Sequence, residues 1–73
     1  MYTVQVRSDD GLVAQEHFDS LEAARERLHW AECVPWHEKH PNPRLEIRDE
    51  DGGTVEAMIY VSVLGGFIHS PLV

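Results

Sequence analysis

Apolar and polar side chains alternate along the first residues of the chain. Tyr2, Val4 and Val6 are separated by polar residues, and this period of two is typical of a strand with one buried face. Residues 8–11 end in an Asp-Gly pair, which favours a tight hairpin because both residue types tolerate a positive φ. Residues 12–18 are therefore predicted to return as a second strand.

The second strand contains a conflict in its pattern. Leu12, Ala14 and Phe18 would share one face with Glu16, so the alternation does not define a purely apolar face. A β-bulge near the turn would resolve this conflict, because one extra residue reverses the facing of the residues on one side of it.

A helix is predicted over residues 21–33. Either Asp19 caps it and Glu22 completes a capping box, or Ser20 caps it alone. The apolar stripe that would pack on a sheet consists of Leu21, Ala24, Leu28 and Ala31. Pro35 lacks an N–H and disfavours helical geometry in the residue before it, so the helix should end or bend there.

The second half of the chain predicts strands separated by glycine-containing turns. Leu45 and Ile47 alternate with charged residues, and the turn at 49–53 leads to a long strand over residues 54–64. A Gly-Gly pair then indicates a further hairpin, with a short last strand over residues 67–70. The order β-β-α-β-β(-β) favours an α+β fold, with an antiparallel sheet of four to five strands and one helix packed on one face. Residues 1–73 are expected to form a single domain.

The long strand is apolar on both faces. The residues expected to face the helix are Val55, Ala57, Ile59, Val61 and Val63. The reverse face would then carry Met58, Tyr60 and Leu64. One helix covers only one face of a sheet, and an exposed apolar patch on the other indicates an association site. Self-association as a homodimer is therefore predicted.

The same topology assigns the turns to two ends of the sheet. A helix that leaves the end of the second strand must run back along the sheet. The turn at Asp9 and Asp10, the segment 29–40 and the second Gly-Gly turn should therefore lie at one end. Asp19 and the turn at 49–51 should lie at the other end.

Charge limits the partners that the chain can bind. The 73 residues include 13 Asp and Glu against 6 Lys and Arg, for a net charge of -7. A surface of this sign repels phosphate, so nucleic acid and anionic membranes are poor partners, and a basic protein surface is favoured. There is no secretion signal and no run of roughly 20 apolar residues, so a cytoplasmic protein without a membrane span is expected.

The segment 29–40 concentrates the aromatic and metal-binding residue types. It holds three of the five histidines, the only cysteine and both tryptophans. Trp30 lies roughly opposite the apolar stripe of the predicted helix, which indicates an interface anchor, since tryptophan is enriched at binding hot spots. The alternatives are that the C-terminal tail, residues 67–73, folds over it, or that a kink before Pro35 rotates it inward.

The same segment leaves two chemical functions open. His29, Cys33, His37 and His40 have the spacing H-x3-C-x3-H-x2-H, a set of ligand types that zinc accepts, so a structural zinc module is one alternative. Cys33 with His29 or His37 could form a thiolate–imidazole pair, so a cysteine-dependent enzyme or accessory subunit is another. No nucleophile motif surrounds Cys33, and neither catalysis nor a cofactor is expected.

The preferred hypothesis is a small acidic non-enzymatic domain that binds a protein with a basic surface. In size and charge the chain resembles small acidic phage-encoded inhibitors, including anti-CRISPR proteins, and this resemblance implies an inhibitor that blocks the nucleic-acid groove of its partner. The predicted partner-binding residues are Trp30, Trp36, Tyr60 and Met58, with the carboxylates of Asp9, Asp10, Asp49, Glu50 and Asp51.

Overall fold

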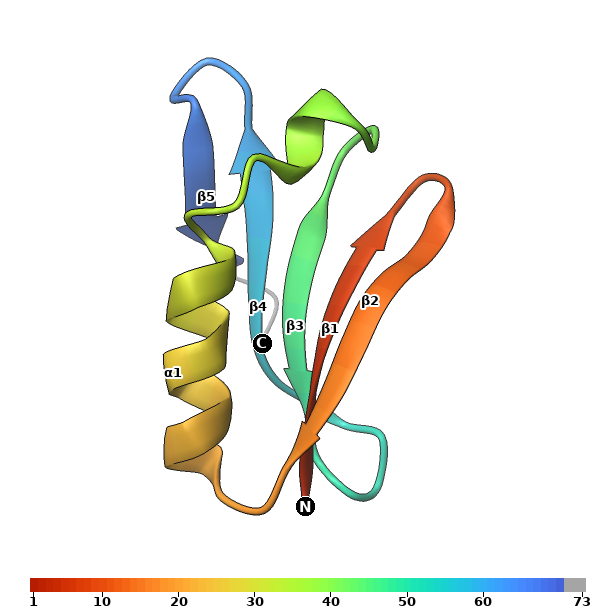
Figure 1. Ribbon diagram of the computed structural model, residues 1–73, viewed down its shortest axis with the longest axis vertical. Coiled ribbons are helices and arrows are strands. Elements are labelled where there is room, and N and C mark those ends of the chain that lie inside the picture. Colours follow the sequence, from red (N-terminus) through yellow and green to blue (C-terminus); the bar gives the residue numbers. More distant parts are fainter. Residues whose placement is uncertain (71–73) are drawn as a thin grey trace.

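The computed structural model describes residues 1–70, and in them one α-helix packs on one face of an antiparallel five-stranded sheet (Figure 1). The elements are β1 Tyr2–Ser8, β2 Gly11–Phe18, α1 Leu21–Ala31, the 3-10 helix η1 Trp36–Glu38, β3 Arg44–Arg48, β4 Thr54–Val61 and β5 Gly66–His69. The strands lie in the order β2-β1-β3-β4-β5, so β2 and β5 are the two edges. The predicted α+β fold is confirmed.

The helix begins at a serine cap and ends before the proline. The Ser20 hydroxyl accepts a hydrogen bond from the backbone N–H of Ala23 at 3.1 Å, so Ser20 is the capping residue. The α-helix ends at Ala31, two residues earlier than predicted. A tight turn follows, in which the Cys33 N–H bonds to the Trp30 carbonyl at 3.1 Å.

The core lies between α1 and the three central strands. Its buried apolar residues are Val4 and Val6 of β1, Ala24, Leu28 and Ala31 of α1, Leu45 and Ile47 of β3, and Met58 of β4. Val4 pairs with Ile47 and Val6 with Leu45 across neighbouring strands, so these four side chains share the helix-facing side of the sheet.

The predicted facing of β4 is wrong beyond Val55, which packs against the core as expected. Met58 pairs with Leu45 and is 2% exposed, so it points into the core under the helix. Ile59 pairs with Ile68 of β5 on the reverse face, and these two side chains are 37% and 40% exposed. An apolar pair does lie on the reverse face, but Met58 and Tyr60 do not belong to it.

Leu64 is also not where it was expected. β4 ends at Val61, and Leu64 lies in the turn before β5, where it is 67% exposed. The register with β3 shifts between Ile47 and Arg48, so Val55 at the start of β4 has no partner in β3. A strand that is apolar on both faces leaves its orientation to such local irregularities.

The β-bulge expected in β2 is present. The register between β1 and β2 shifts next to the turn, so Leu12 pairs with Arg7 while Ala14 pairs with Val6 on the helix-facing side. Val13 packs against the core. Only Ala14 and Glu16 then face the helix along the middle of β2, and neither is large and apolar. No large apolar side chain from the middle of β2 therefore fills the space between this strand and the helix.

The two ends of the sheet contain the turns that the topology predicts. Figure 1 shows the β1–β2 turn, η1 and the β4–β5 turn at the upper end, and the turn between β3 and β4 at the lower end. The Asp9 N–H bonds to the carbonyl of Pro41 at 3.0 Å and ties two of the upper segments together. The molecule is 33 Å long, so the acidic turns at its two ends are well separated.

Candidate functional site

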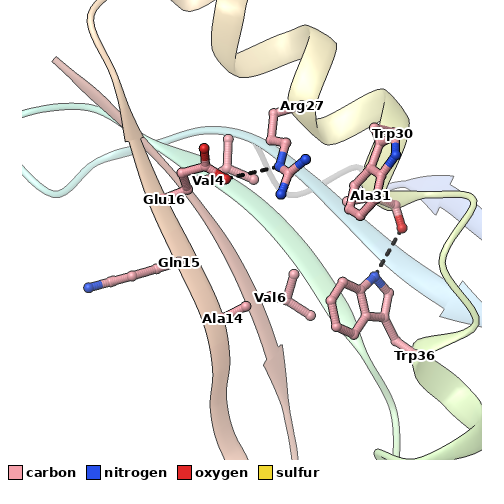
Figure 2. A pocket seen from close by; sticks show the side chains of 9 residues that line it. All are labelled: Val4, Val6, Ala14, Gln15, Glu16, Arg27, Trp30, Ala31 and Trp36. Carbon is pink, nitrogen blue, oxygen red and sulfur yellow. Dashed lines mark hydrogen bonds and ion pairs between the residues drawn. The ribbon is translucent and has the colours of Figure 1, made fainter.

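A groove runs between α1 and β2, where the sheet is left partly uncovered (Figure 2). Its lining residues are Val4 and Val6 of β1, Ala14, Gln15 and Glu16 of β2, Arg27, Trp30 and Ala31 of α1, and Trp36 of η1. Its volume of about 60 Å³ is far below the roughly 300 Å³ of a small-molecule site. The groove suits one apolar side chain of a partner.

Trp30 forms the exposed rim of this groove. It is 54% exposed, which is unusual for so large an apolar side chain. The Arg27 guanidinium lies 4.1 Å from the centre of its ring, in a cation–π contact, and Arg27 Nε lies 3.0 Å from the Glu16 carboxylate. Arg27 therefore joins the helix to β2 across the groove and holds the indole in place.

Trp36 closes one end of the groove and has a structural role. Its Nε1–H donates a hydrogen bond to the Ala31 carbonyl at 2.9 Å, and its half-buried ring packs against the core. The same carbonyl accepts the backbone N–H of Val34 at 3.1 Å, so the indole adds a second hydrogen bond to an oxygen at the C-terminus of the helix. Of the two tryptophans, only Trp30 presents most of its ring to solvent.

Tyr60 and Met58 do not form the surface that the sequence predicted for them. The Tyr60 ring stacks on His37 with a centroid distance of 4.5 Å and an interplanar angle of 8°. Phe67 contacts the same ring edge-to-face at 5.5 Å. Tyr60 is thus half-buried below η1 between two aromatic neighbours. Met58 is a core residue and presents almost no surface to a partner.

The predicted acidic residues at the upper end lie in the β1–β2 turn. Asp9 accepts a hydrogen bond from the Asn42 amide at 2.7 Å and lies 3.8 Å from Arg44, so it holds the turn against the chain before β3. Asp10 is exposed, with its carboxylate 3.7 Å from Nδ1 of His40. Asp10 is therefore the better placed of the two to meet a partner.

The acidic residues at the lower end have similarly distinct roles. The Asp49 carboxylate accepts hydrogen bonds from the backbone N–H groups of Asp51 and Gly53, at 3.0 and 2.9 Å, and shapes the turn. Glu50 accepts a hydrogen bond from the N-terminal ammonium of Met1, which holds the pKa of Glu50 below its usual value. Asp51 is exposed.

The candidate zinc ligands do not converge. His29 Nδ1 lies 3.1 Å from the Glu32 carboxylate, while the Cys33 thiol contacts the His29 carbonyl at 3.9 Å and not an imidazole. His37 stacks on Tyr60, as described above. Within residues 1–70, no group of three His, Cys, Asp or Glu side chains has the geometry of a metal site. The four residues therefore do not form a ready-made tetrahedron.

Of the residues that line the groove, the sequence hypothesis named only Trp30 and Trp36, and it missed the two charged ones, Arg27 and Glu16. A signal for Arg27 existed, because residues three apart on a helix are neighbours and Arg27 precedes Trp30 by three. Glu16 could not be placed beside Arg27 from the sequence, since that contact depends on how the helix crosses β2.

Comparisons with family models, with curated proteins and with solved structures gave no match for this chain. No helix in the described part of the chain is long and apolar enough to cross a membrane. The C-terminal cover considered for Trp30 falls partly on residues 71–73, outside the described residues. In its described part, Phe67 contacts Tyr60.

Proposed function

We propose that this protein is a small acidic non-enzymatic domain that binds another protein through Trp30 and the groove beside it. The observation that carries this proposal is the exposed Trp30 indole at the rim of an apolar recess. Tryptophan is enriched among the few residues that contribute most of the free energy of protein–protein binding. Burying this ring against a partner would remove a large apolar area from water.

The charge supports a partner with a basic surface. A net charge of -7 on 73 residues attracts positive surfaces at long range and raises the rate of encounter with them. The exposed carboxylates of Asp10 and Asp51 lie at opposite ends of the molecule. They therefore act as separate contributions to steering and not as one acidic patch.

The sharper form of the proposal is an inhibitor that occupies the nucleic-acid-binding surface of its partner. Such a surface is basic because it binds phosphate, so an acidic protein competes for the same charges. The size and charge that the chain shares with phage-encoded inhibitors, including anti-CRISPR proteins, support this form.

The experiment starts with affinity capture by the intact immobilised chain, in parallel with Trp30→Ala and Val63→Ala. Val63 is 93% exposed in the β4–β5 turn and serves as a matched apolar control. A partner lost with Trp30→Ala and kept with Val63→Ala supports the proposal. Capture that is indifferent to Trp30 contradicts it.

The captured partner, once purified, tests the inhibitor hypothesis. Anisotropy of a labelled oligonucleotide bound to that partner should fall as the acidic protein is added. If the oligonucleotide stays bound at saturating protein, the partner is bound elsewhere and the inhibitor form is wrong, while protein binding stands.

Self-association is a second candidate, and the Ile59–Ile68 pair on the reverse face favours it. Two copies that bury these side chains against each other would remove the exposed apolar area. Sedimentation equilibrium over a range of concentrations tests this, and a monomer at all concentrations contradicts it. Ile59→Asp should shift any dimer toward monomer.

A further inference from the structure

β2 is an edge strand of eight residues. Within residues 1–70 it pairs with β1 alone, so its other side presents backbone N–H and C=O groups in a row. An extended peptide can add to such an edge as a further strand, with affinity from the backbone hydrogen bonds and specificity from pockets for alternate side chains. The backbone of β2 is therefore a possible docking edge.

The groove supplies the pocket that this mode of binding needs. Ala14 and Glu16 of β2 face it, whereas Gln15 points away (Figure 2). A strand added beside β2 would turn every second side chain toward the same side of the sheet. One apolar side chain of that strand could then reach the recess between Ala14 and Trp30. Edge and groove thus form one continuous surface.

The charge along this surface selects the incoming strand. Residues 8–24, from the end of β1 into α1, contain no Lys or Arg. The five acidic residues of this stretch are Asp9, Asp10, Glu16, Asp19 and Glu22. Four of these acids flank the two ends of β2, while Glu16 in the strand is ion-paired with Arg27 of the groove at 3.0 Å. A basic strand therefore meets opposite charge at its two ends, where an acidic strand is repelled.

The same charges disfavour a second copy as the occupant. Antiparallel pairing of β2 with β2 of another copy would bring Asp9 and Asp10, before one strand, near Asp19 and Glu22, after the other. Glu16 also faces the groove from within the strand, and an inward charge on an edge is a known obstacle to indiscriminate pairing.

We infer that β2 and the adjoining groove bind an extended basic segment of the partner protein by β-strand addition. This inference rests on the proposed protein-binding function and specifies its mode. In the complex, an apolar side chain of the segment packs against Trp30 and Ala14. Its basic side chains lie near Asp10 at one end of β2 and near Asp19 at the other.

The probe is a synthetic peptide of alternating valine and lysine, about as long as β2, titrated into the full chain and followed by NMR. A valine–glutamate peptide of equal length is the charge control. When the lysine peptide binds, the β2 amides should gain protection from hydrogen exchange with water, and the β5 amides should not. The glutamate peptide should protect neither strand. Each N-methyl group placed on a peptide N–H that bonds to β2 should weaken binding about tenfold. Because every second N–H of an added strand faces β2, the sensitive positions should alternate along the peptide.

A pair of variants tests the groove. Ala14→Met fills the recess from the strand side and should weaken binding of the valine–lysine peptide at least about tenfold. Ala57→Met adds the same side chain to the reverse face of β4 and should leave binding unchanged. Both variants need native amide spectra before the comparison is made.

The outcomes separate this inference from the proposed function. Binding that requires Trp30 but ignores N-methylation overturns strand addition and leaves protein binding intact. Protection at β5, or no binding of the lysine peptide, also overturns strand addition. Loss of Trp30 dependence for the captured partner overturns the proposed function itself.

Discussion

The two edge strands, β2 and β5, have different protection against unwanted pairing. β2 has eight residues and carries an inward-facing Glu16, whereas β5 has only four residues. Inward charge and short length are two established ways of preventing association between edges. β5 therefore offers few backbone groups to an added strand, while β2 offers more of them beside an acidic side chain.

The space between the sheet and the segments that cover it also differs at the two edges. Near β5, the His37 ring stacks on Tyr60, and Phe67 contacts the same Tyr60 ring edge-to-face. Near β2, Ala14 leaves a recess and Trp30 remains exposed at its rim. Aromatic rings therefore contact one another on the β5 side, whereas an exposed tryptophan borders a recess on the β2 side.

The largest expected effect on the free energy of unfolding comes from the buried face of β4, the strand that pairs with β5. Met58→Ala should lower the free energy of unfolding by about 2 to 5 kcal/mol, because it leaves a cavity in the core. Ile59→Ala, on the exposed reverse face, should cost less than about 1 kcal/mol. Urea denaturation of both variants measures the difference, and equal losses would contradict the facing described here.

The two tryptophans give the next largest effect. Trp36→Ala removes a packed ring and its hydrogen bond to the Ala31 carbonyl, so it should cost about 2 kcal/mol or more. Trp30→Ala should cost less than about 1 kcal/mol, since most of that ring is in water. Thermal and urea unfolding test this, and a Trp30 variant as unstable as the Trp36 variant would show that the β2 side is closed.

Charge reversal at the two ends of the molecule separates local from long-range attraction. Asp10 lies beside β2, so Asp10→Lys should weaken binding of the valine–lysine peptide about tenfold at low salt. Asp51→Lys makes the same change in net charge at the far end and should weaken it only about twofold. Calorimetric titrations at two salt concentrations compare them. Equal losses would mean that net charge alone attracts the peptide.

The smallest expected effect is a pH dependence at the lower end of the sheet. The hydrogen bond and charge of the N-terminal ammonium lower the pKa of Glu50 below its ordinary value of 4.5. Folding therefore favours the ionised form of Glu50. The resulting stabilisation of the folded state is present above pH 4.5 and is lost as the pH falls through the lowered pKa of Glu50. Urea midpoints measured across this range should show a slightly shallower acid decline for Glu50→Gln. An unchanged profile would show that the pairing adds nothing.

Most of the secondary structure could be predicted because its signals are local. The alternation of Val4 and Val6, the serine before the helix and the proline after it each depend on neighbours within a few residues. The position of Trp30 on the helix, opposite Leu28, also followed from helical periodicity, but the sequence left open whether the C-terminal tail covers it. These features need no knowledge of distant contacts.

The errors arose where two assignments satisfied the same pattern. β4 is apolar at both odd and even positions, so its alternation could not decide between Met58 and Ile59. The register with β3, set by contacts such as Leu45 with Met58, decided it. The clustering of His37 and His40 near Cys33 along the chain likewise did not predict their neighbours in space, because His37 stacks on Tyr60.

The sequence by itself determined the order of the elements, the antiparallel fold class and the acidic surface, because periodicity, turn residues and charge act over short distances. The tertiary structure alone decided which face of β4 is buried and that a groove remains between α1 and β2. It also brought Glu16, Arg27 and Trp30 together. The physical reason is that strand register, β-bulges and the position of the helix over the sheet are set by contacts between residues far apart in the chain.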